Sequence, residues 1–193
     1  ELAAAAPHLD ALVCNAGAMT KELTRTREGF EVTLATHLAF GSWLLSSELL
    51  PLLGKSADPR VIFVSSGGMY ATPWPGSAAA SWEAPAAVYT AETAYTYCKR
   101  GQVLLAERMA LMHRGVKWVS CHPGWVDTNG VDKWVGRGKI AYAPLRTLRQ
   151  GAEGIAWLCT TRGQGLEDGG FYLDRRLEPK HLAGAFMSEG TFT

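Results

Sequence analysis

Tyr95 and Lys99 are the two residues of this sequence whose types and spacing are best suited to chemistry. They lie four positions apart within residues 91–113, a pattern typical of a long helix, so both side chains are expected on one helix face. A neighbouring ammonium favours the charged form of a phenol, which titrates near pH ~10 when free. The pair is therefore predicted to pass a proton near neutral pH. A solvated helix face gives the same spacing, so other motifs must decide between the two interpretations.

Three further motifs each follow an apolar run that is typical of a buried strand. They are Asn15-Ala16-Gly17 after residues 12–14, Ser65-Ser66 after residues 60–64, and Pro123-Gly124 after residues 116–121. Ligands of open α/β sheets bind outside the carboxyl ends of the strands, where these turns would lie. A hydroxyl there can donate to a substrate carbonyl oxygen, and a Pro-Gly turn lets the backbone approach a flat ring. Each motif alone would also fit an ordinary turn.

In this order, the four motifs resemble the short-chain dehydrogenase/reductase family. Its marks are Asn-Ala-Gly after the fourth strand, a serine after the fifth, Tyr-x-x-x-Lys in the next helix, and Pro-Gly with a nearby threonine after the sixth. The resemblance covers nearly the whole chain. It implies an α/β fold, the C-terminal part of a Rossmann-type doubly wound parallel sheet with helices on both faces. Residues 1–193 are then expected to form a single incomplete domain, without the family's first three strand-helix units and their pyrophosphate loop.

The resemblance implies an oxidoreductase that uses NADP or NAD to reduce a carbonyl or to oxidise an alcohol. Ser66 would polarise the substrate oxygen, Tyr95 would transfer the proton, and Lys99 would lower the pKa of that tyrosine and hold the ribose hydroxyls. The residues implied in cofactor binding are Asn15, Ala16 and Gly17 on the adenosine side, Tyr95 and Lys99, and Pro123, Gly124, Val126 and Thr128 around the nicotinamide.

Within the family, the strongest resemblance is to the member 12 type. It rests on the stretch at residues 58–69, on Lys99-Arg100, on His122-Pro-Gly-Trp-x-Asp-Thr128, and on the tail Gly170-Phe-x-x-Asp-Arg175. This type implies no defined substrate. Many family members also carry an asparagine in the helix expected at residues 29–53, where it holds a water near the lysine. This chain has Thr36 and His37 there instead, and His37 either replaces the asparagine or only packs.

The remaining segments are read from periodicity. The helix at residues 29–53 has a stripe of leucines at positions 34, 38, 45, 49 and 52 and is expected to end near Pro51. A further helix is expected at residues 145–158 and a last strand at residues 170–173. Residues 70–90 form a long loop in which Trp74, Trp82 and Tyr89 either wall a substrate pocket or pack on the surface. The family resemblance, and not periodicity, implies a lid at residues 132–144, with Trp134, Val135 and Tyr142 facing the substrate.

Composition limits the alternatives. At 193 residues, 47% hydrophobic and a net charge of +1, the chain is expected to form one packed domain and not a nucleic-acid-binding surface. It contains no apolar run of the roughly 18 residues that a membrane span needs. The four cysteines, Cys14, Cys98, Cys121 and Cys159, lie in separate apolar segments, so reduced thiols in an intracellular, reducing compartment are expected, without a metal site.

A second function stays open at this point. The chain could be a catalytically silent scaffold or accessory subunit, derived from the same fold, that binds a partner protein along the open edge of the strand at Leu12. The missing pyrophosphate loop and the missing asparagine favour it, whereas the presence of Ser66, Tyr95 and Lys99 favours an enzyme acting on a small carbonyl or alcohol. The chain begins at Glu1, so targeting cannot be read from it.

Overall fold

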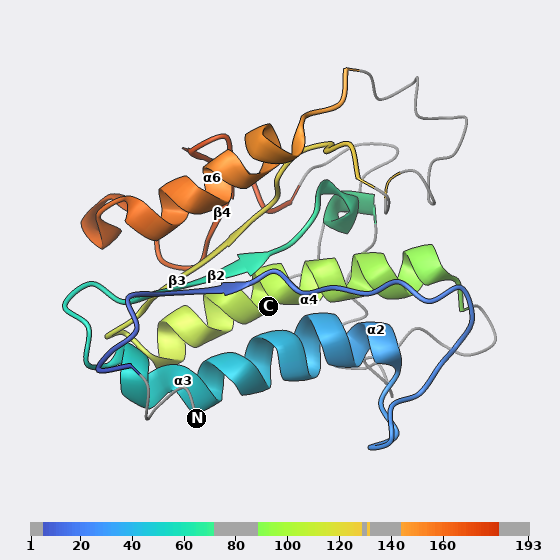
Figure 1. The fold of residues 1–193 in the computed structure, drawn as a ribbon, viewed down its shortest axis with the longest axis horizontal. Helices are drawn as coiled ribbons and strands as arrows, with labels where there is room; N and C mark the ends of the chain where they lie inside the picture. Colours follow the sequence, from blue (N-terminus) through green and yellow to red (C-terminus); the bar gives the residue numbers. More distant parts are fainter. Residues whose placement is uncertain (1–5, 72–88, 129–130, 132–143, 182–193) are drawn as a thin grey trace.

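The computed structural model describes residues 6–71, 89–128, 131 and 144–181 (Figure 1). Several residues named above lie outside the described residues, namely Trp74 and Trp82 of the long loop and Trp134, Val135 and Tyr142 of the expected lid.

Five strands form one sheet at the centre of the described residues. They are β1 (Ala11–Cys14), β2 (Arg60–Val64), β3 (Lys117–Cys121), β4 (Gly170–Leu173) and β5 (Arg176–Leu177). The strands lie in chain order; the first three pairings are parallel and the β4–β5 pairing is antiparallel. Every residue of β2 is buried, as expected for a parallel strand covered on both faces. The predicted strands are therefore confirmed, and the short β5 is an addition.

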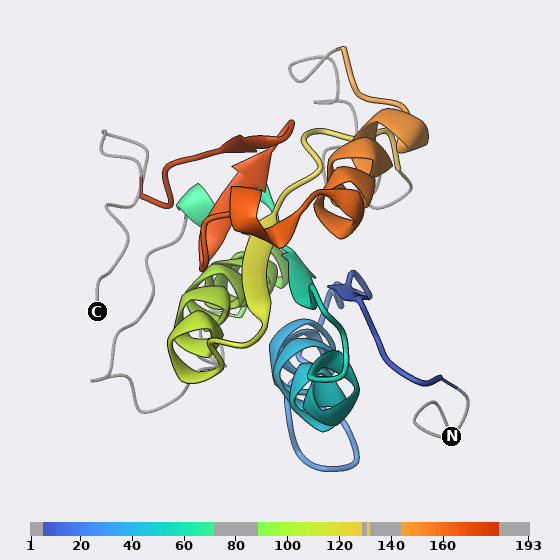
Figure 2. The ribbon, with the colours of Figure 1, turned by 90° about the vertical axis from the view of Figure 1, so that its left-hand side faces the viewer.

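Helices cover both faces of the sheet (Figures 1 and 2). One long helical run consists of α2 (Val32–Leu34), η1 (Ala35–Leu44) and α3 (Leu45–Leu53), and the other long helices are α4 (Ala91–Met112) and α6 (Leu148–Thr160). The separate short turns are η2 (Gly67–Ala71) and η5 (Gly163–Gly165). Helices α3 and α4 lie side by side beneath the sheet in Figure 1, and α6 lies above it. The prediction of an α/β fold with helices on both faces is confirmed.

Two apolar cores follow from the alternation of side chains along the central strands. Val61 and Phe63 of β2 pack with Trp118 in the core that also contains residues of α3 and α4. Ile62 and Val64 point the other way, into the core that includes Leu158 of α6. The sheet is thereby fixed between its two helical layers, and the carboxyl ends of its strands meet at one edge.

The run α2–η1–α3 is continuous, but its middle section η1 is a π-helix. A π-helix takes more residues per turn than an α-helix, so the buried face shifts relative to the predicted leucine stripe. Ser42 and Ser46 are fully buried, whereas Leu45 of the stripe is 41% exposed. Gly41 permits the wide turn, because a Cβ at this position would lie 1.8 Å from the Thr36 carbonyl oxygen. The run ends at Leu53, beyond Pro51.

The helix starts follow from side-chain caps. Thr90 accepts a hydrogen bond from the backbone N–H of Thr93 and so begins α4 at Ala91. Thr147 and Gln150 form a capping box, so α6 begins at Leu148, three residues later than predicted.

Candidate active site

The sheet register brings the predicted turns to one edge. Cys14 at the end of β1 pairs with Phe63 of β2, and Val64 at the end of β2 pairs with Cys121 at the end of β3. The turns that follow these three strands therefore emerge beside one another, at the carboxyl edge where open α/β sheets bind ligands.

Tyr95 and Lys99 come to this edge from α4. The Lys99 ammonium nitrogen lies 5.4 Å from the centroid of the Tyr95 ring, so the predicted placement on one helix face is confirmed. Lys99 is only 4% exposed and donates to the carbonyl oxygen of Val64 at 2.6 Å and to the side-chain oxygen of Gln102 at 3.2 Å. The lysine is thus tied to the end of β2.

The two serines after β2 have different surroundings. The Ser65 hydroxyl is buried and donates to the carbonyl oxygen of Lys99 at 2.7 Å, which fastens β2 to α4. The Ser66 hydroxyl accepts from the N–H of Gly68 at 3.2 Å and lies near enough to Tyr95 to lower the pKa of its phenol. Of the pair, Ser66 is the serine that the structure brings to the tyrosine.

Burial dominates the pKa of Tyr95. Burial raises the pKa of this phenol, and the nearby Ser66 hydroxyl offsets that only in part. Burial also lowers the pKa of Lys99 to about 8. The ammonium lies over the ring of Tyr95 and is held by Val64 and Gln102. Burial is therefore the main influence on the pKa of Tyr95, and the lowering of that pKa by Lys99 stays a prediction.

His37 packs between the Asn15–Gly17 turn and Tyr95. Its ring meets the Tyr95 ring edge-on, with the centroids 5.4 Å apart, and its Nε2 lies 2.8 Å from the carbonyl oxygen of Ala18 and 3.1 Å from the Ala18 nitrogen. Burial lowers the pKa of His37 to about 3, so the ring is neutral. A single Nε2 cannot both donate and accept, and the shorter contact favours donation to the Ala18 carbonyl.

This packing explains the glycine of the Asn-Ala-Gly motif. A Cβ on Gly17 would lie 2.3 Å from Cε1 of His37, so the turn and the histidine ring are matched in shape. Of the two residues considered in place of the family's asparagine, His37 is the one whose ring contacts Tyr95. With so low a pKa the ring is uncharged near neutral pH, so the contact itself is one of packing, and replacement of the asparagine by His37 stays a prediction.

The Pro123–Gly124 turn is held by an arginine from a later part of the chain. Gly124 has a φ of 77°, a conformation that favours glycine. Arg146 donates to the carbonyl oxygen of Pro123 at 3.2 Å and pairs with Asp174 through two contacts of 2.5 and 2.6 Å. A Cβ on Gly124 would lie 2.5 Å from the Arg146 guanidinium carbon. Only glycine leaves room for the arginine here.

Val126 and Thr128, the residues expected at the nicotinamide amide, lie just beyond this turn. The Val126 side chain is buried against α6, so close that a Cβ on Gly151 would lie 2.4 Å from it. Its side chain therefore faces the helix, and any contact with a cofactor must come from its main chain. The Thr128 hydroxyl accepts from the N–H of Val131 at 3.3 Å.

Tyr89 is the one described aromatic residue of the expected pocket wall. Its hydroxyl lies 3.0 Å from the hydroxyl of Thr20 and donates to a carboxylate oxygen of Glu31 at 3.2 Å. Glu31 in turn caps α2 by accepting from the N–H groups of Thr33 and Leu34. Tyr89 thus anchors the segment before α4 against the start of α2.

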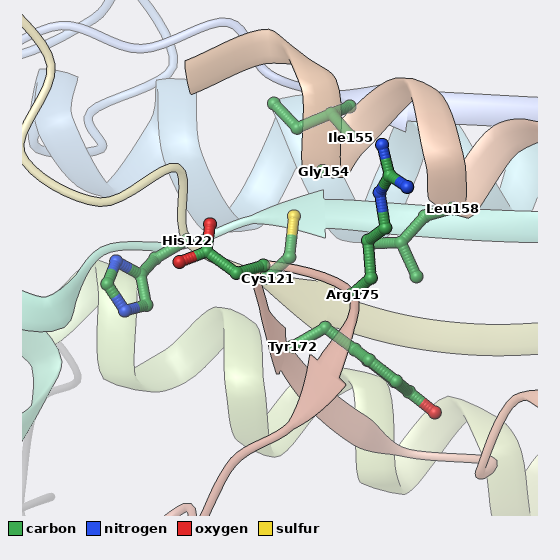
Figure 3. Close-up of a pocket in the computed structure, with 8 residues that line it drawn as sticks. Cys121, His122, Gly154, Ile155, Leu158, Tyr172 and Arg175 are labelled. Atoms are coloured by element: carbon green, nitrogen blue, oxygen red, sulfur yellow. The ribbon is translucent and has the colours of Figure 1, made fainter. Parts of the chain in front are cut away.

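A small cavity lies beside the end of β3, between Cys121, His122, Tyr172, Arg175 and α6 (Figure 3). Its volume is about 10 Å³, enough for roughly one water molecule and far too small for a nicotinamide. His122 stacks on Phe171 with the ring centroids 5.6 Å apart, and burial lowers its pKa to about 4. This cavity is therefore a small packing gap and not a pocket for the cofactor.

Three residues of the site were missed from the sequence. Gln102 lies one turn beyond Lys99 on α4, and that spacing was the available signal. Arg146 and Asp174 lie 28 positions apart and have no local signature as a pair, although Asp174 belongs to the tail motif Gly170-Phe-x-x-Asp-Arg175.

The described ranges contain neither a metal-binding cluster nor a membrane-spanning helix. They contain no group of three or more His, Cys, Asp or Glu residues arranged to hold a metal ion. None of the helices described here is long and apolar enough to cross a membrane.

Comparison with curated proteins gives named relatives, whereas no family model matches the chain. Dehydrogenase/reductase SDR family member 12 of Bos taurus is 37% identical over 180 residues, which are 90% of this chain and 54% of that protein. A Streptomyces protein named as a daunorubicin C-13 ketoreductase is 34% identical over 185 residues, covering 90% of this chain and 58% of its own. The chain thus spans somewhat more than half the length of these relatives.

Solved structures show the same fold at lower identity. A short chain dehydrogenase from Salmonella enterica serovar Typhi has a TM-score of 0.61 and 18% identity, over 89% of this chain and 64% of that one. An NADPH-bound carbonyl reductase from chicken fatty liver has a TM-score of 0.56 and 20% identity, over 88% of this chain and 65% of that one. The predicted resemblance, including the member 12 type, is confirmed by these comparisons.

Proposed function

Because the chain belongs to the short-chain dehydrogenase/reductase family, we propose that it carries the reacting part of an oxidoreductase that uses NADP or NAD. Its substrate would be a small molecule with a carbonyl to reduce or an alcohol to oxidise. We propose that residues 1–193 are one incomplete Rossmann-type domain, since they span somewhat more than half of the relatives' length.

The observation that carries the proposal is the meeting of Ser66, Tyr95 and Lys99. Ser66 comes from the turn after β2, and the other two residues come from α4. The serine hydroxyl is close enough to the tyrosine to lower the pKa of its phenol, and the lysine nitrogen lies 5.4 Å from the centre of the tyrosine ring. A hydroxyl pair beside a buried cation is suited to bind a carbonyl oxygen and to supply it with a proton.

Each side chain then has a defined task. Ser66 donates to the substrate oxygen as negative charge develops there, and Tyr95 gives that oxygen its proton. The raised pKa of Tyr95 keeps the phenol protonated near neutral pH, which suits carbonyl reduction. Lys99, whose pKa lies near 8, supplies positive charge at neutral pH. The bound nicotinamide would supply the hydride, and the protein would supply orientation and electrostatics.

The residues around the strand ends fit such a cofactor. The turn Asn15-Ala16-Gly17 would take the adenosine side, and Pro123, Gly124, the main chain of Val126, and Thr128 would take the nicotinamide side. Gly124 supports this assignment, because its φ of 77° shapes the turn and its lack of a side chain lets Arg146 pack against the turn and bind the Pro123 carbonyl. One structural neighbour is named as NADPH-bound, which favours NADP as the first cofactor to test.

The thiols support a reducing compartment, as proposed from the sequence. All four cysteines are free, and three are buried, Cys14, Cys98 and Cys121. Burial raises the pKa of each of these three to about 12, so they are inert packing groups.

The alternative function, a silent scaffold that binds a partner protein along β1, gains no support from the relatives, which are named as a dehydrogenase/reductase and a ketoreductase.

The test is a titration of NADPH and NADH into the protein from its natural source, followed by nicotinamide fluorescence and by a screen of carbonyl substrates. Tyr95→Phe is expected to bind the cofactor and to lose turnover by a factor of about 10² or more, since it removes the proton donor. Tyr97→Phe, two residues away on the same helix, is the matched control and keeps turnover. If neither nucleotide binds up to millimolar concentration, the proposal fails.

A further inference from the structure

The position of the Lys99 ammonium depends on a glutamine one turn along α4. The lysine nitrogen donates to Oε1 of Gln102 at 3.2 Å and to the carbonyl oxygen of Val64 at 2.6 Å. Gln102 is 1% exposed, so the contact is shielded from water. An ammonium has three N–H donors, and these two contacts leave one for a ligand.

The other end of the same amide is fixed to the π-helix. Nε2 of Gln102 donates to the carbonyl oxygen of His37 at 3.0 Å and to the hydroxyl of Ser42 at 3.0 Å. The Ser42 hydroxyl itself donates to the His37 carbonyl at 2.5 Å. His37, Ser42, Lys99 and Gln102 are all buried, so the network is closed to solvent.

These partners allow only one orientation of the amide. If the amide were reversed, its NH₂ group would face the ammonium, donor against donor, and its oxygen would face the His37 carbonyl, acceptor against acceptor. Ser42 reinforces the choice, because its proton is directed to His37 and its lone pairs are left to accept from Gln102. The carbonyl end of Gln102 is thereby held toward Lys99.

We propose that Gln102 is the positioning residue of Lys99: its amide links the ammonium to the His37 carbonyl of the π-helix and so directs the remaining N–H donor to the bound nucleotide. This inference rests on the proposed function for the identity of the ligand, and on the hydrogen-bond network alone for the link between the two residues. In this proposal the π-helix η1 supplies the acceptors that hold Gln102, since Ser42 and the His37 carbonyl both belong to η1.

The first test measures the pKa of Lys99 directly, by NMR of lysine labelled at Cε and Nζ. The chain has seven lysines, and Lys99→Arg identifies the signal. The other titratable groups around the ammonium are Tyr95, Cys98, Cys121 and His37; the raised pKa values of the first three and the value of about 3 for His37 keep them neutral near pH 8. A shift in the Lys99 signal therefore reports on Gln102.

Two variants of nearly the same volume are expected to move this pKa in opposite directions. Gln102→Met removes a hydrogen bond to the charged form and lowers the pKa further, whereas Gln102→Glu places a carboxylate beside the ammonium and raises it by about 1 or more. Ser46→Ala is the control, because it removes a buried hydroxyl one turn beyond Ser42 that bonds to Trp43. If both Gln102 variants leave the Lys99 pKa where Ser46→Ala leaves it, the inference is overturned; should the Met variant not fold, the Glu variant alone decides.

The second test uses the nucleotide. Gln102→Met is expected to weaken NADPH binding about 3- to 10-fold, and to add no further loss when combined with Lys99→Ala, since both changes act through one ammonium. Additive losses in the double variant would overturn the inference. A parent protein that binds neither NADPH nor NADH would end the proposed function, and the NMR titration would still decide whether Gln102 positions Lys99.

Discussion

Arg146 and Asp174 form a two-point ion pair, with contacts of 2.5 and 2.6 Å, directly against the Pro123–Gly124 turn. The arginine also donates to the Pro123 carbonyl. Asp174 reaches this position from the turn between β4 and β5, where it has a φ of 49°. A non-glycine residue in this conformation costs energy, and its partnership with Arg146 offsets that cost.

We predict that Arg146→Lys weakens cofactor binding but has little effect on the free energy of unfolding. A lysine cannot make the two parallel contacts, so the turn loses its support. The ion pair is partly exposed, and its own contribution to the free energy of unfolding is expected to be only about 0–1 kcal/mol. The dissociation constant for NADPH is expected to rise about 3- to 10-fold, measured by fluorescence titration.

Arg175→Lys is the matched control for this prediction. Arg175 is the neighbouring residue of the same turn and pairs with Glu153 of α6. It has no contact with Pro123 among those described, so its replacement is expected to leave NADPH binding unchanged. Equal effects of the two substitutions would show that the ion pair at the Pro123–Gly124 turn has no special role.

The π-helix gives a prediction about stability. Gly41→Ala is expected to lower the free energy of unfolding by about 1–3 kcal/mol or more, because the added Cβ would lie 1.8 Å from the Thr36 carbonyl oxygen. Gly154→Ala on α6 is the control: nothing lies within 4 Å of its Cβ position, and alanine is expected to add about 0.5–1 kcal/mol. Urea denaturation of the two variants decides, and a stabilising Gly41→Ala would contradict the π-helical turn.

Most strands and helices of the described residues were predictable because each depends on local signals. β2 is a continuous apolar run between turn residues, and α4 begins after a capping threonine and carries its apolar residues at helical spacing. These elements need only the identity of near neighbours in the chain. The choice of Ser66 as the serine beside Tyr95 came instead from the resemblance to the family.

The features that the sequence did not predict depend on contacts between distant residues. The π-helix replaces an expected α-helical stripe because Gly41 permits a wide turn, and the amide of Gln102 meets the His37 carbonyl across 65 positions. The raised pKa of Tyr95 follows from burial, which residue spacing does not report. Arg146 and Asp174 meet across 28 positions of the chain.

Gly17 and His37 are predicted to depend on each other. Gly17→Ala alone would force the histidine ring to move, since the new Cβ would lie 2.3 Å from it, and both stability and cofactor binding are expected to fall. His37→Ala removes the ring, so the same glycine substitution is expected to cost at least about 1 kcal/mol less in that background. A double-mutant cycle by thermal or urea unfolding measures this coupling, and strictly additive effects would contradict it.

The buried ammonium of Lys99 makes stability depend on pH in a defined direction. Its pKa falls from 10.5 to about 8 because burial disfavours the charge. Between these two values, the unfolded chain holds a proton that the folded protein has released, so stability rises with pH there; below pH 8 both states are protonated and the full cost of burial applies. Relative to Lys99→Met, the parent is expected to gain about 2 kcal/mol between pH 7 and pH 9.5.

The measurement is urea unfolding of parent and Lys99→Met without added nucleotide, at several pH values across this window. The difference between the two free energies of unfolding removes the titration of groups that both proteins share. The cost of leaving Val64 and Gln102 without their donor is the same at every pH, so it does not affect how this difference changes with pH. Lys55→Met removes an exposed lysine and is expected to give a difference that does not change with pH. If Lys99→Met behaves like Lys55→Met, the ammonium is not buried as described, and the same result would remove the basis for its positioning by Gln102.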